Sequence, residues 1–294
     1  MALIAMNNPR VRVITDSVAD IPPQLTRQLG IKVVPIHLTL GKTSYLVDGA
    51  TDDHDWFYRE LVQSSVSPKT ASPAPEEFLK LYRELISEGA EDIIGLFASA
   101  NVSSLCDHAL LAARELSGAR VSVIDTGQIS MGIGWLALMA AEAAARGASL
   151  EEIEALVKAA RGRTQVFGLL DTSEYLRRSG RVSWATTQLV NLLQIKPMIV
   201  FAEGEARLIG RVRTHQRALQ RMVDLVQTIT PLERLAVLHA HTDLRTVMRL
   251  RDALLPYAPE VPPPVIEVGP IFGAHVGPGA VGVALVRKSA ATSL

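Results

Sequence analysis

Short aliphatic runs alternate with amphipathic helical patterns over the first 125 residues, and this alternation restricts the fold more than any other feature of the sequence. The aliphatic runs are typical of buried strands, which we predict at Val11–Thr15, Lys32–Leu40, Asp92–Ala98 and Val121–Asp125. Helices are predicted between them, at Pro22–Leu29, Asp53–Gln63, Pro75–Ser87 and Val102–Leu116. Strands separated by helices favour an α/β fold with a doubly wound, mostly parallel sheet.

The second predicted strand contains a proline. Apolar residues alternate along Lys32–Leu40 at the period of a strand, from Val34 to Leu40. Pro35 lies among them, and proline has no N–H to donate to a neighbouring strand. The sequence therefore predicts a sheet edge or a bulge at this position.

The pattern changes from about Arg161 onward. Strands are predicted at Thr164–Leu170, Pro197–Ala202, Leu208–Val212, Leu235–Ala240, Val265–Val268 and Ala280–Val286, with helices at Thr214–Val226 and Leu244–Leu254. Two of these strands flank Glu203-Gly204-Glu205 and read as a hairpin. We therefore predict two domains, an N-terminal α/β domain over 1–158 and a C-terminal α+β domain with a mixed sheet over 159–294.

Charge and composition exclude several classes of protein. The chain has 30 Lys+Arg and 30 Asp+Glu, and only 5% of its residues are aromatic, so we expect no nucleic-acid partner. Cys106 is the single cysteine, which excludes an intrachain disulfide and a thiolate zinc cluster. The longest apolar stretch, within Ile133–Ala145, is shorter than the roughly 20 residues of a membrane-spanning helix. Met1–Arg10 lacks the features of a secretory signal, and we expect a cytoplasmic protein.

Small polar side chains follow the predicted strands of the N-terminal half. Ligands of α/β sheets bind where the strands end, and helix N-termini favour anions. Ser103 and Ser104 follow one strand and lie at the N-terminus of the next predicted helix, so they either cap that helix or bind a ligand. Ser72, which follows Lys69 and Thr70, has the same two interpretations.

A glycine-rich segment near the C-terminus contains His275. Gly277–Gly282 formally matches G-x-G-x-x-G, but a strand is predicted after it instead of a helix, so we reject dinucleotide binding. His275 lies just before this predicted tight loop. It either donates a hydrogen bond to an anion or only holds the loop to neighbouring backbone.

Two further groups of residues have both a structural and a functional interpretation. The arginines around Arg181 and Arg213 form solvated faces or contact a phosphate or an acidic partner. His239 and His241, with Asp243, are placed as in some metal hydrolases. No G-x-S-x-G motif marks a nucleophilic serine.

Several short motifs occur in an order that resembles the DegV family of bacterial fatty-acid-binding proteins. The resemblance covers nearly the whole chain, and its specificity comes from the order of the motifs. These motifs are Ile14-Thr15-Asp16-Ser17-Val18-Ala19-Asp20-Ile21-Pro22, Val34-Pro35, Lys69-Thr70, Asp125-Thr126, Tyr175-Leu176, Ser179-Gly180-Arg181-Val182, Ile195-Lys196-Pro197 and His275-Val276-Gly277-Pro278-Gly279.

The resemblance implies a non-catalytic carrier of a long-chain fatty acid such as palmitate or oleate, with the ligand site between the two domains and with no cofactor. It assigns the carboxylate to Thr70, Ser103 and His275, with Ser104 as a neighbouring donor. It also implies an ATP-dependent fatty acid kinase as partner, which phosphorylates the bound acid. Arg181 and Arg213 are then candidates for contact with that partner or with the acyl-phosphate.

The chain departs from the family pattern at three motifs. Thr70-Ala71-Ser72-Pro73-Ala74 stands for Thr-Ser-x-Pro-Ser, Ser103-Ser104-Leu105-Cys106 for Ser-Gly-Thr-Tyr, and Ser179-Gly180-Arg181 for Gly-Gly-Arg. The first hydroxyl of the first two motifs is kept, and so the expected carboxylate site is kept. The alternative function is a metal-dependent or acyl hydrolase that uses His239, His241 and Asp243.

Overall fold

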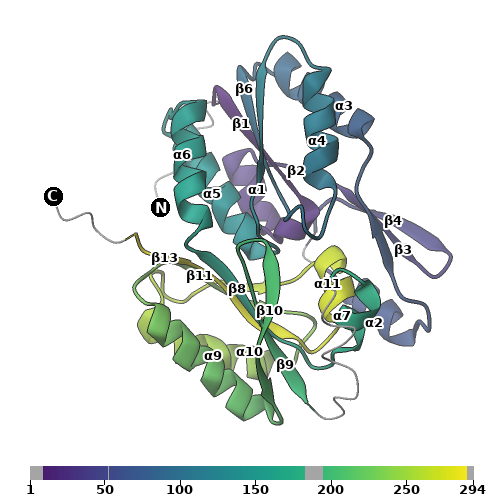
Figure 1. The fold of residues 1–294 in the computed structure, drawn as a ribbon, viewed down its shortest axis with the longest axis vertical. Helices are drawn as coiled ribbons and strands as arrows, with labels where there is room; N and C mark the ends of the chain where they lie inside the picture. The colour runs from purple at the N-terminus through teal and green to yellow at the C-terminus, as the bar shows by residue number, and fades with distance from the viewer. Residues whose placement is uncertain (1–8, 52, 183–194, 290–294) are drawn as a thin grey trace.

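The computed structural model describes residues 9–51, 53–182 and 195–289, and its N-terminal half is built on a parallel sheet (Figure 1). The strand order is β2-β1-β6-β7, and all neighbours are parallel. All six residues of β1 are buried, as expected for a strand covered on both faces. The predicted doubly wound sheet is thus confirmed. Its strands are β1 (Val11–Asp16), β2 (Lys32–Val34), β6 (Asp92–Phe97) and β7 (Arg120–Asp125).

Helices cover both faces of this sheet. Helices α3 (Pro75–Ser87) and α4 (Leu105–Arg114) pack together on one side, and α5 (Met131–Ala145) packs on β1 with α1 (Pro23–Leu29) and α6 (Leu150–Arg161) on the other (Figure 1). Helix α5 is almost entirely buried because it also contacts the second sheet, where Trp135 Nε1 donates to the carbonyl of Ala284 at 3.1 Å. No helix in the described part of the chain is long and apolar enough to cross a membrane.

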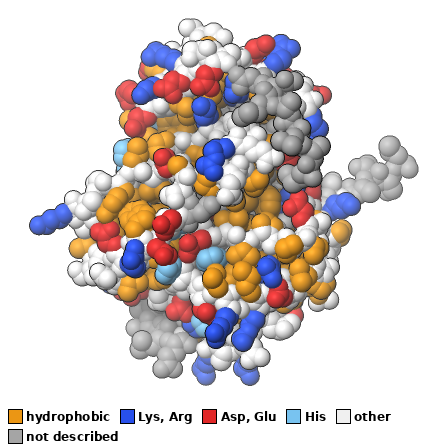
Figure 2. Space-filling model, turned by 180° about the vertical axis from the view of Figure 1, so that it is seen from behind, with side chains coloured by type: hydrophobic (Ala, Val, Ile, Leu, Met, Phe, Trp, Pro, Cys, Tyr) orange, Lys and Arg blue, Asp and Glu red, His pale blue; other side chains and the backbone are white. Residues whose placement is uncertain are grey.

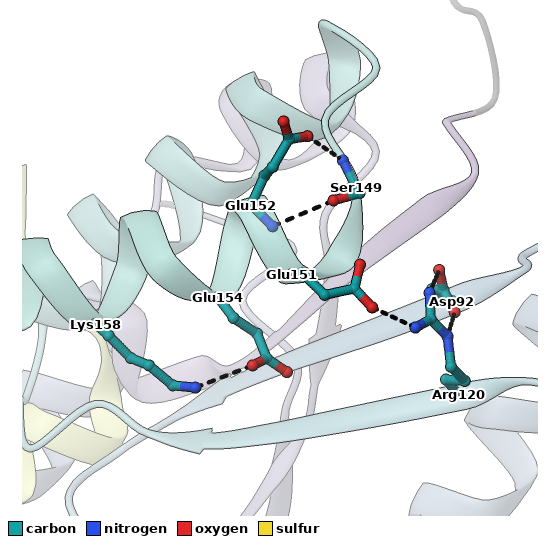
Figure 3. A network of polar contacts seen from close by, with 7 residues as sticks. All are labelled: Asp92, Arg120, Ser149, Glu151, Glu152, Glu154 and Lys158. Carbon is teal, nitrogen blue, oxygen red and sulfur yellow. Dashed lines mark hydrogen bonds and ion pairs between the residues drawn. The ribbon is translucent and has the colours of Figure 1, made fainter.

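A polar network fixes the start of α6 at the end of the sheet away from the strands' carboxyl ends. Ser149 and Glu152 cap the helix reciprocally, and Arg120 binds both oxygens of Asp92 at 2.7 Å and also contacts Glu151 (Figure 3). The group is exposed, so each pair adds little stability. The carboxyl ends of the strands, at the opposite end of the sheet, take no part in this network.

The C-terminal half is built on a six-stranded mixed sheet of order β10-β9-β8-β13-β11-β12. All neighbours are antiparallel except β11 and β12, and the predicted β9–β10 hairpin is present. Helices α9 (His215–Ile229) and α10 (Leu244–Leu254) pack on one face, and α5 contacts the other. The mixed sheet is thus confirmed. Its strands are β8 (Thr164–Leu169), β9 (Lys196–Ala202), β10 (Glu205–Val212), β11 (Leu232–His239), β12 (Val265–Glu267) and β13 (Val281–Arg287).

The chain passes from the first sheet to the second between the end of α6 and the start of β8. The boundary that the sequence suggested, between residues 158 and 159, lies inside α6. The division into domains over 1–158 and 159–294 stays a prediction.

The strand predicted at Lys32–Leu40 is two strands. β2 ends at Val34, Pro35 interrupts the pairing, and β3 (Ile36–Leu40) joins a different sheet. That sheet has the order β4-β3-β5, with β4 (Thr43–Val47) and β5 (Lys69–Ala71) on either side of β3, and was not predicted. Proline therefore marks a change of sheet here, where an edge or a bulge was expected.

The loop expected around His275 begins as a helix. Helix α11 (Pro270–Val276) places His275 in its last turn, beside α7 (Glu174–Ser179) and α2 (Asp55–Gln63). Gly277 ends the helix at φ +73°, and a Cβ there would lie 2.1 Å from the Tyr175 ring. A helix precedes the glycines and β13 follows them, which is the reverse of a dinucleotide-binding turn.

Candidate functional site

A cavity lies between the two halves of the molecule. Its volume, taken as the space that the centre of a water molecule can occupy, is about 150 Å³. Nearly all of its lining is apolar. Strands of the mixed sheet and of the β4-β3-β5 sheet line it, together with α11 and the segments that follow β1 and β6, so neither half forms it alone. The apolar lining includes Val18, Ile36, Ala98, Val102, Ile129, Val166, Leu170, Leu176, Ile199, Phe201, Ala206, Leu238, Val268, Ile271, Phe272 and Val276.

Two glycines create space for the cavity in the mixed sheet. Gly168 on β8 and Gly282 on β13 lie directly opposite one another, and both line the cavity. A Cβ on Gly168 would meet no atom within 4 Å, whereas one on Gly282 would lie 2.4 Å from the carbonyl of Phe167. Glycine inside a strand weakens the strand but permits close approach of a ligand. Both glycines lie inside predicted strands, where a glycine is a sequence signal for the close approach of a ligand or of another backbone segment.

Hydroxyl groups gather where β5 and the loop before α4 meet the cavity. Thr70, Ser72 and Ser103 all line it, and the Ser72 and Ser103 Oγ atoms are 3.4 Å apart. Ser104 does not line the cavity, but its Oγ donates to that of Ser72 at 3.1 Å. The structure therefore brings Thr70 and Ser103 together and adds Ser72.

Ser72 does not cap a helix, which was one of its two interpretations. Ala74 holds the N-cap position of α3, and the Glu77 carboxylate accepts from the Ala74 N–H at 3.0 Å. Ser104 holds the N-cap position of α4, but its side chain makes no capping bond. Neither serine side chain is used in capping, and both belong to the cluster of hydroxyls at the cavity.

His275 lines the same cavity from α11. Burial, with a smaller contribution from the positive charge of Arg181, lowers the pKa of His275 to about 4. The ring is therefore neutral at pH 7. Its buried Nδ1 has no hydrogen-bond partner among the described residues, so the ring has an unused capacity to donate or accept.

Of the two arginines singled out in the sequence, one lies at the cavity. Arg181 lines it and donates from Nη1 to the carbonyl of Val102 at 2.7 Å. Arg213 is exposed after β10 and does not line the cavity. A positive charge therefore lies near His275 and the hydroxyls, where it attracts an anion.

Other polar residues at strand ends hold the backbone. Asp16 accepts from the N–H groups of Val18 and Ala98, both at 2.8 Å. Thr126 donates to the carbonyl of Phe97 at 2.7 Å. Their side chains are used by the fold and do not line the cavity.

The residues of the alternative metal site line a second cleft, although His239 also lines the apolar cavity. His241 Nδ1 is 3.5 Å from carboxylate oxygens of both Asp55 and Glu267, while Asp243 caps α10 by accepting from the Thr246 N–H at 3.2 Å. Among residues 9–51, 53–182 and 195–289, no three His, Cys, Asp or Glu side chains are arranged to hold a metal ion. Asp243 is therefore not placed with His239 and His241 as a ligand.

The surface carries charges of both signs. Figure 2 shows one face of the molecule, on which Lys and Arg side chains are mixed with Asp and Glu. This face presents no continuous basic surface of the kind that follows a nucleic-acid backbone.

We expect His275 to make the ligand-free protein less stable in acid. The unfolded chain protonates this ring near pH 6.5, whereas the folded protein does so only near pH 4, so stability falls as the pH is lowered between these values. The contribution is roughly 3 kcal/mol in total. Urea unfolding of wild type and His275→Gln at pH 7 and 4.5 measures it. The variant should lose less stability in acid, and an equal loss would contradict the assignment.

The parallel and mixed sheets, with an apolar cavity whose wall carries hydroxyls and a neutral histidine, define an α/β protein of two sheets with a largely apolar site between its halves. Comparison with known families gives the particular one. The chain belongs to the DegV family, whose model, described as an uncharacterised protein family, matches residues 10–288.

Relatives and solved structures agree with this assignment. A DegV domain-containing protein of Streptomyces coelicolor is 34% identical over 285 residues, covering 95% of this chain and 99% of its own. A structure from Thermus thermophilus, titled as fatty acid binding of a DegV family protein, has a TM-score of 0.86 at 30% identity and covers 95% of this chain and 100% of its own. DegV of Bacillus subtilis, titled a fatty acid binding protein, has a TM-score of 0.84 at 26% identity, with 96% and 100% covered.

Proposed function

We propose that this protein binds a long-chain fatty acid, such as palmitate or oleate, in the cavity between its two halves. It carries the acid without chemistry of its own and without a cofactor. The observation that carries the proposal is a nearly apolar cavity that Thr70, Ser103 and His275 all line. The fatty acids named for the relatives from Thermus thermophilus and Bacillus subtilis support the same ligand class.

The chemistry of the lining matches the two ends of such a ligand. An acyl tail gains about 0.8 kcal/mol for each buried methylene group. A buried carboxylate is costly unless several donors satisfy it. Thr70, Ser103 and the neutral His275 ring supply hydrogen bonds, and Arg181 supplies a positive charge beside them.

Lipid analysis of the purified protein tests this function. An organic extract is examined by mass spectrometry, and delipidated protein is titrated with oleate and palmitate. We expect a stoichiometric fatty acid in the extract or saturable uptake of either acid. Protein that contains no lipid and takes up neither acid would overturn the proposal.

We further propose that the bound acid is presented to an ATP-dependent fatty acid kinase, which phosphorylates the carboxyl group. Arg181 supports this because it is exposed and also lines the cavity beside the hydroxyl group. Arg213 is exposed on the same half of the chain and is proposed as a contact with the partner.

We expect Arg181→Ala to reduce ATP-dependent acyl-phosphate formation by roughly tenfold or more at saturating oleate, because a charge-assisted contact to the reacting group is lost. A cognate kinase, ATP and oleate-loaded protein are used for the assay. Arg177→Ala, which removes an exposed arginine of α7, is the matched control and should leave the rate unchanged. An unchanged rate with Arg181→Ala would remove this residue from the proposal.

A further inference from the structure

The start of α11 is held by residues from the other half of the chain. This matters because α11 has only seven residues and carries His275 in its last turn. Tyr58 Oη donates to the carbonyl of Val268 at 2.8 Å. A carboxyl oxygen of Asp20 accepts from the next N–H, that of Gly269, also at 2.8 Å.

Asp20 also binds a second element of its own half. Ser130, the buried N-cap residue of α5, donates from Oγ to the other Asp20 oxygen at 2.5 Å. Both residues have a positive φ, +51° at Asp20 and +49° at Ser130. Such conformations are unfavourable for residues other than glycine and persist where the surrounding structure holds them. The carboxyl group thus links α5 to the start of α11.

The space around this link is closely packed. A Cβ added to Gly269 would lie 3.2 Å from the Asp20 oxygen, and one on Gly273 would lie 2.6 Å from Tyr58 Oη. Burial raises the pKa of Asp20 to about 7. Both protonation states are therefore populated near neutral pH, and in either state an oxygen remains to accept from the Gly269 N–H.

We propose that Asp20 is a positioning residue, which fixes α11 and thereby sets His275 against the acyl cavity by joining Ser130 to the backbone of Gly269. The expected effect of Asp20 on fatty-acid binding rests on the proposed function, whereas its expected effect on the position of α11 does not. A helix of two turns moves as a short rod, because each of its later N–H groups is bonded one turn back. A shift at Gly269 is therefore carried to His275.

Hydrogen exchange tests the structural half of this proposal without any ligand. The Gly273 N–H bonds to Gly269 and the Gly277 N–H bonds to Gly273, both at 2.8 Å, so they report on α11 directly. We expect exchange at these amides to become roughly tenfold faster in Asp20→Ala and to stay near wild type in Asp20→Asn, whose carbonyl still accepts from Gly269. Asp48→Ala is the control, since Asp48 is an exposed carboxylate that accepts from the Ala50 N–H.

Oleate titration tests the functional half. We expect Asp20→Ala to weaken oleate binding by roughly tenfold and Asp20→Asn to restore most of it. In a His275→Ala background, Asp20→Ala should weaken binding further by less than about twofold, because the residue through which it acts is absent. If Asp20 acted independently of His275, the fold-losses of oleate affinity caused by the two substitutions would multiply.

The outcomes separate the two proposals. If wild type does not bind oleate, the proposed function fails, and exchange at α11 still decides whether Asp20 positions this helix. Unchanged exchange in Asp20→Ala would overturn the positioning role, as would multiplying losses in the double variant. If Asp20→Ala does not fold, Ser130→Ala breaks the same link from its other end and is measured in its place.

Discussion

Replacing Gly168 with phenylalanine is expected to reduce the affinity for oleate by at least about 100-fold. Gly168 lines the cavity, and a Cβ at this position meets no atom within 4 Å. The new ring would thus enter the space proposed for the acyl tail. Excluding three or four methylene groups at about 0.8 kcal/mol each costs roughly 3 kcal/mol of binding energy.

The same substitution should not destabilise the ligand-free protein. Phenylalanine favours strands, and filling an apolar space adds contacts. Gly162→Phe is the matched control, because Gly162 also has no atom within 4 Å of an added Cβ but lies exposed at the end of α6. Titration with oleate and urea unfolding of both variants separate a blocked cavity from a damaged fold. Full oleate affinity in Gly168→Phe would place the acyl chain elsewhere.

The regular part of the fold was predictable because the patterns there are local. The strands of the parallel sheet are short aliphatic runs, and helices such as α3 bury one face at helical spacing, so period alone identifies them. The β9–β10 hairpin was predicted for the same reason, from two runs flanking a turn that contains Gly204.

The third sheet was missed because its strands carry no strong local signal. In β4 no residue is fully buried, and β5 has only three residues, so both depend on pairing with β3. Helix α11 was missed because Gly269, Gly273 and Gly277 suggest a loop. Its glycines serve tight packing instead: a Cβ on Gly273 or Gly277 would clash with Tyr58 or Tyr175.

The candidate site was predictable residue by residue but not as a cavity. Thr70, Ser103 and His275 are far apart in the chain. Ser103 and His275 were singled out by their local sequence, the resemblance assigned all three to one site, and the structure brings them to one cavity. For Ser72 the sequence left capping and ligand binding open, and Arg213 was grouped with Arg181 although it lies outside the cavity. The apolar wall depends on two sheets meeting, and no local pattern reports that.

We expect His275→Ala to weaken oleate binding by roughly 10- to 100-fold, or about 1–3 kcal/mol, because a buried carboxylate would lose a donor. The His275 ring is neutral, and its Nδ1 has no hydrogen-bond partner among the described residues. A hydrogen bond from this nitrogen to the ligand therefore breaks no hydrogen bond to another described residue. Titration of delipidated wild type and variant at pH 7 measures the loss.

Methyl oleate separates recognition of the head group from packing of the tail. The ester keeps the same chain but has no negative charge, so removing a donor costs it much less than it costs the acid. We therefore expect His275→Ala to change the affinity for methyl oleate by less than about threefold. An equal loss for acid and ester would show that His275 only shapes the cavity, and an unchanged affinity for both would remove it from the site.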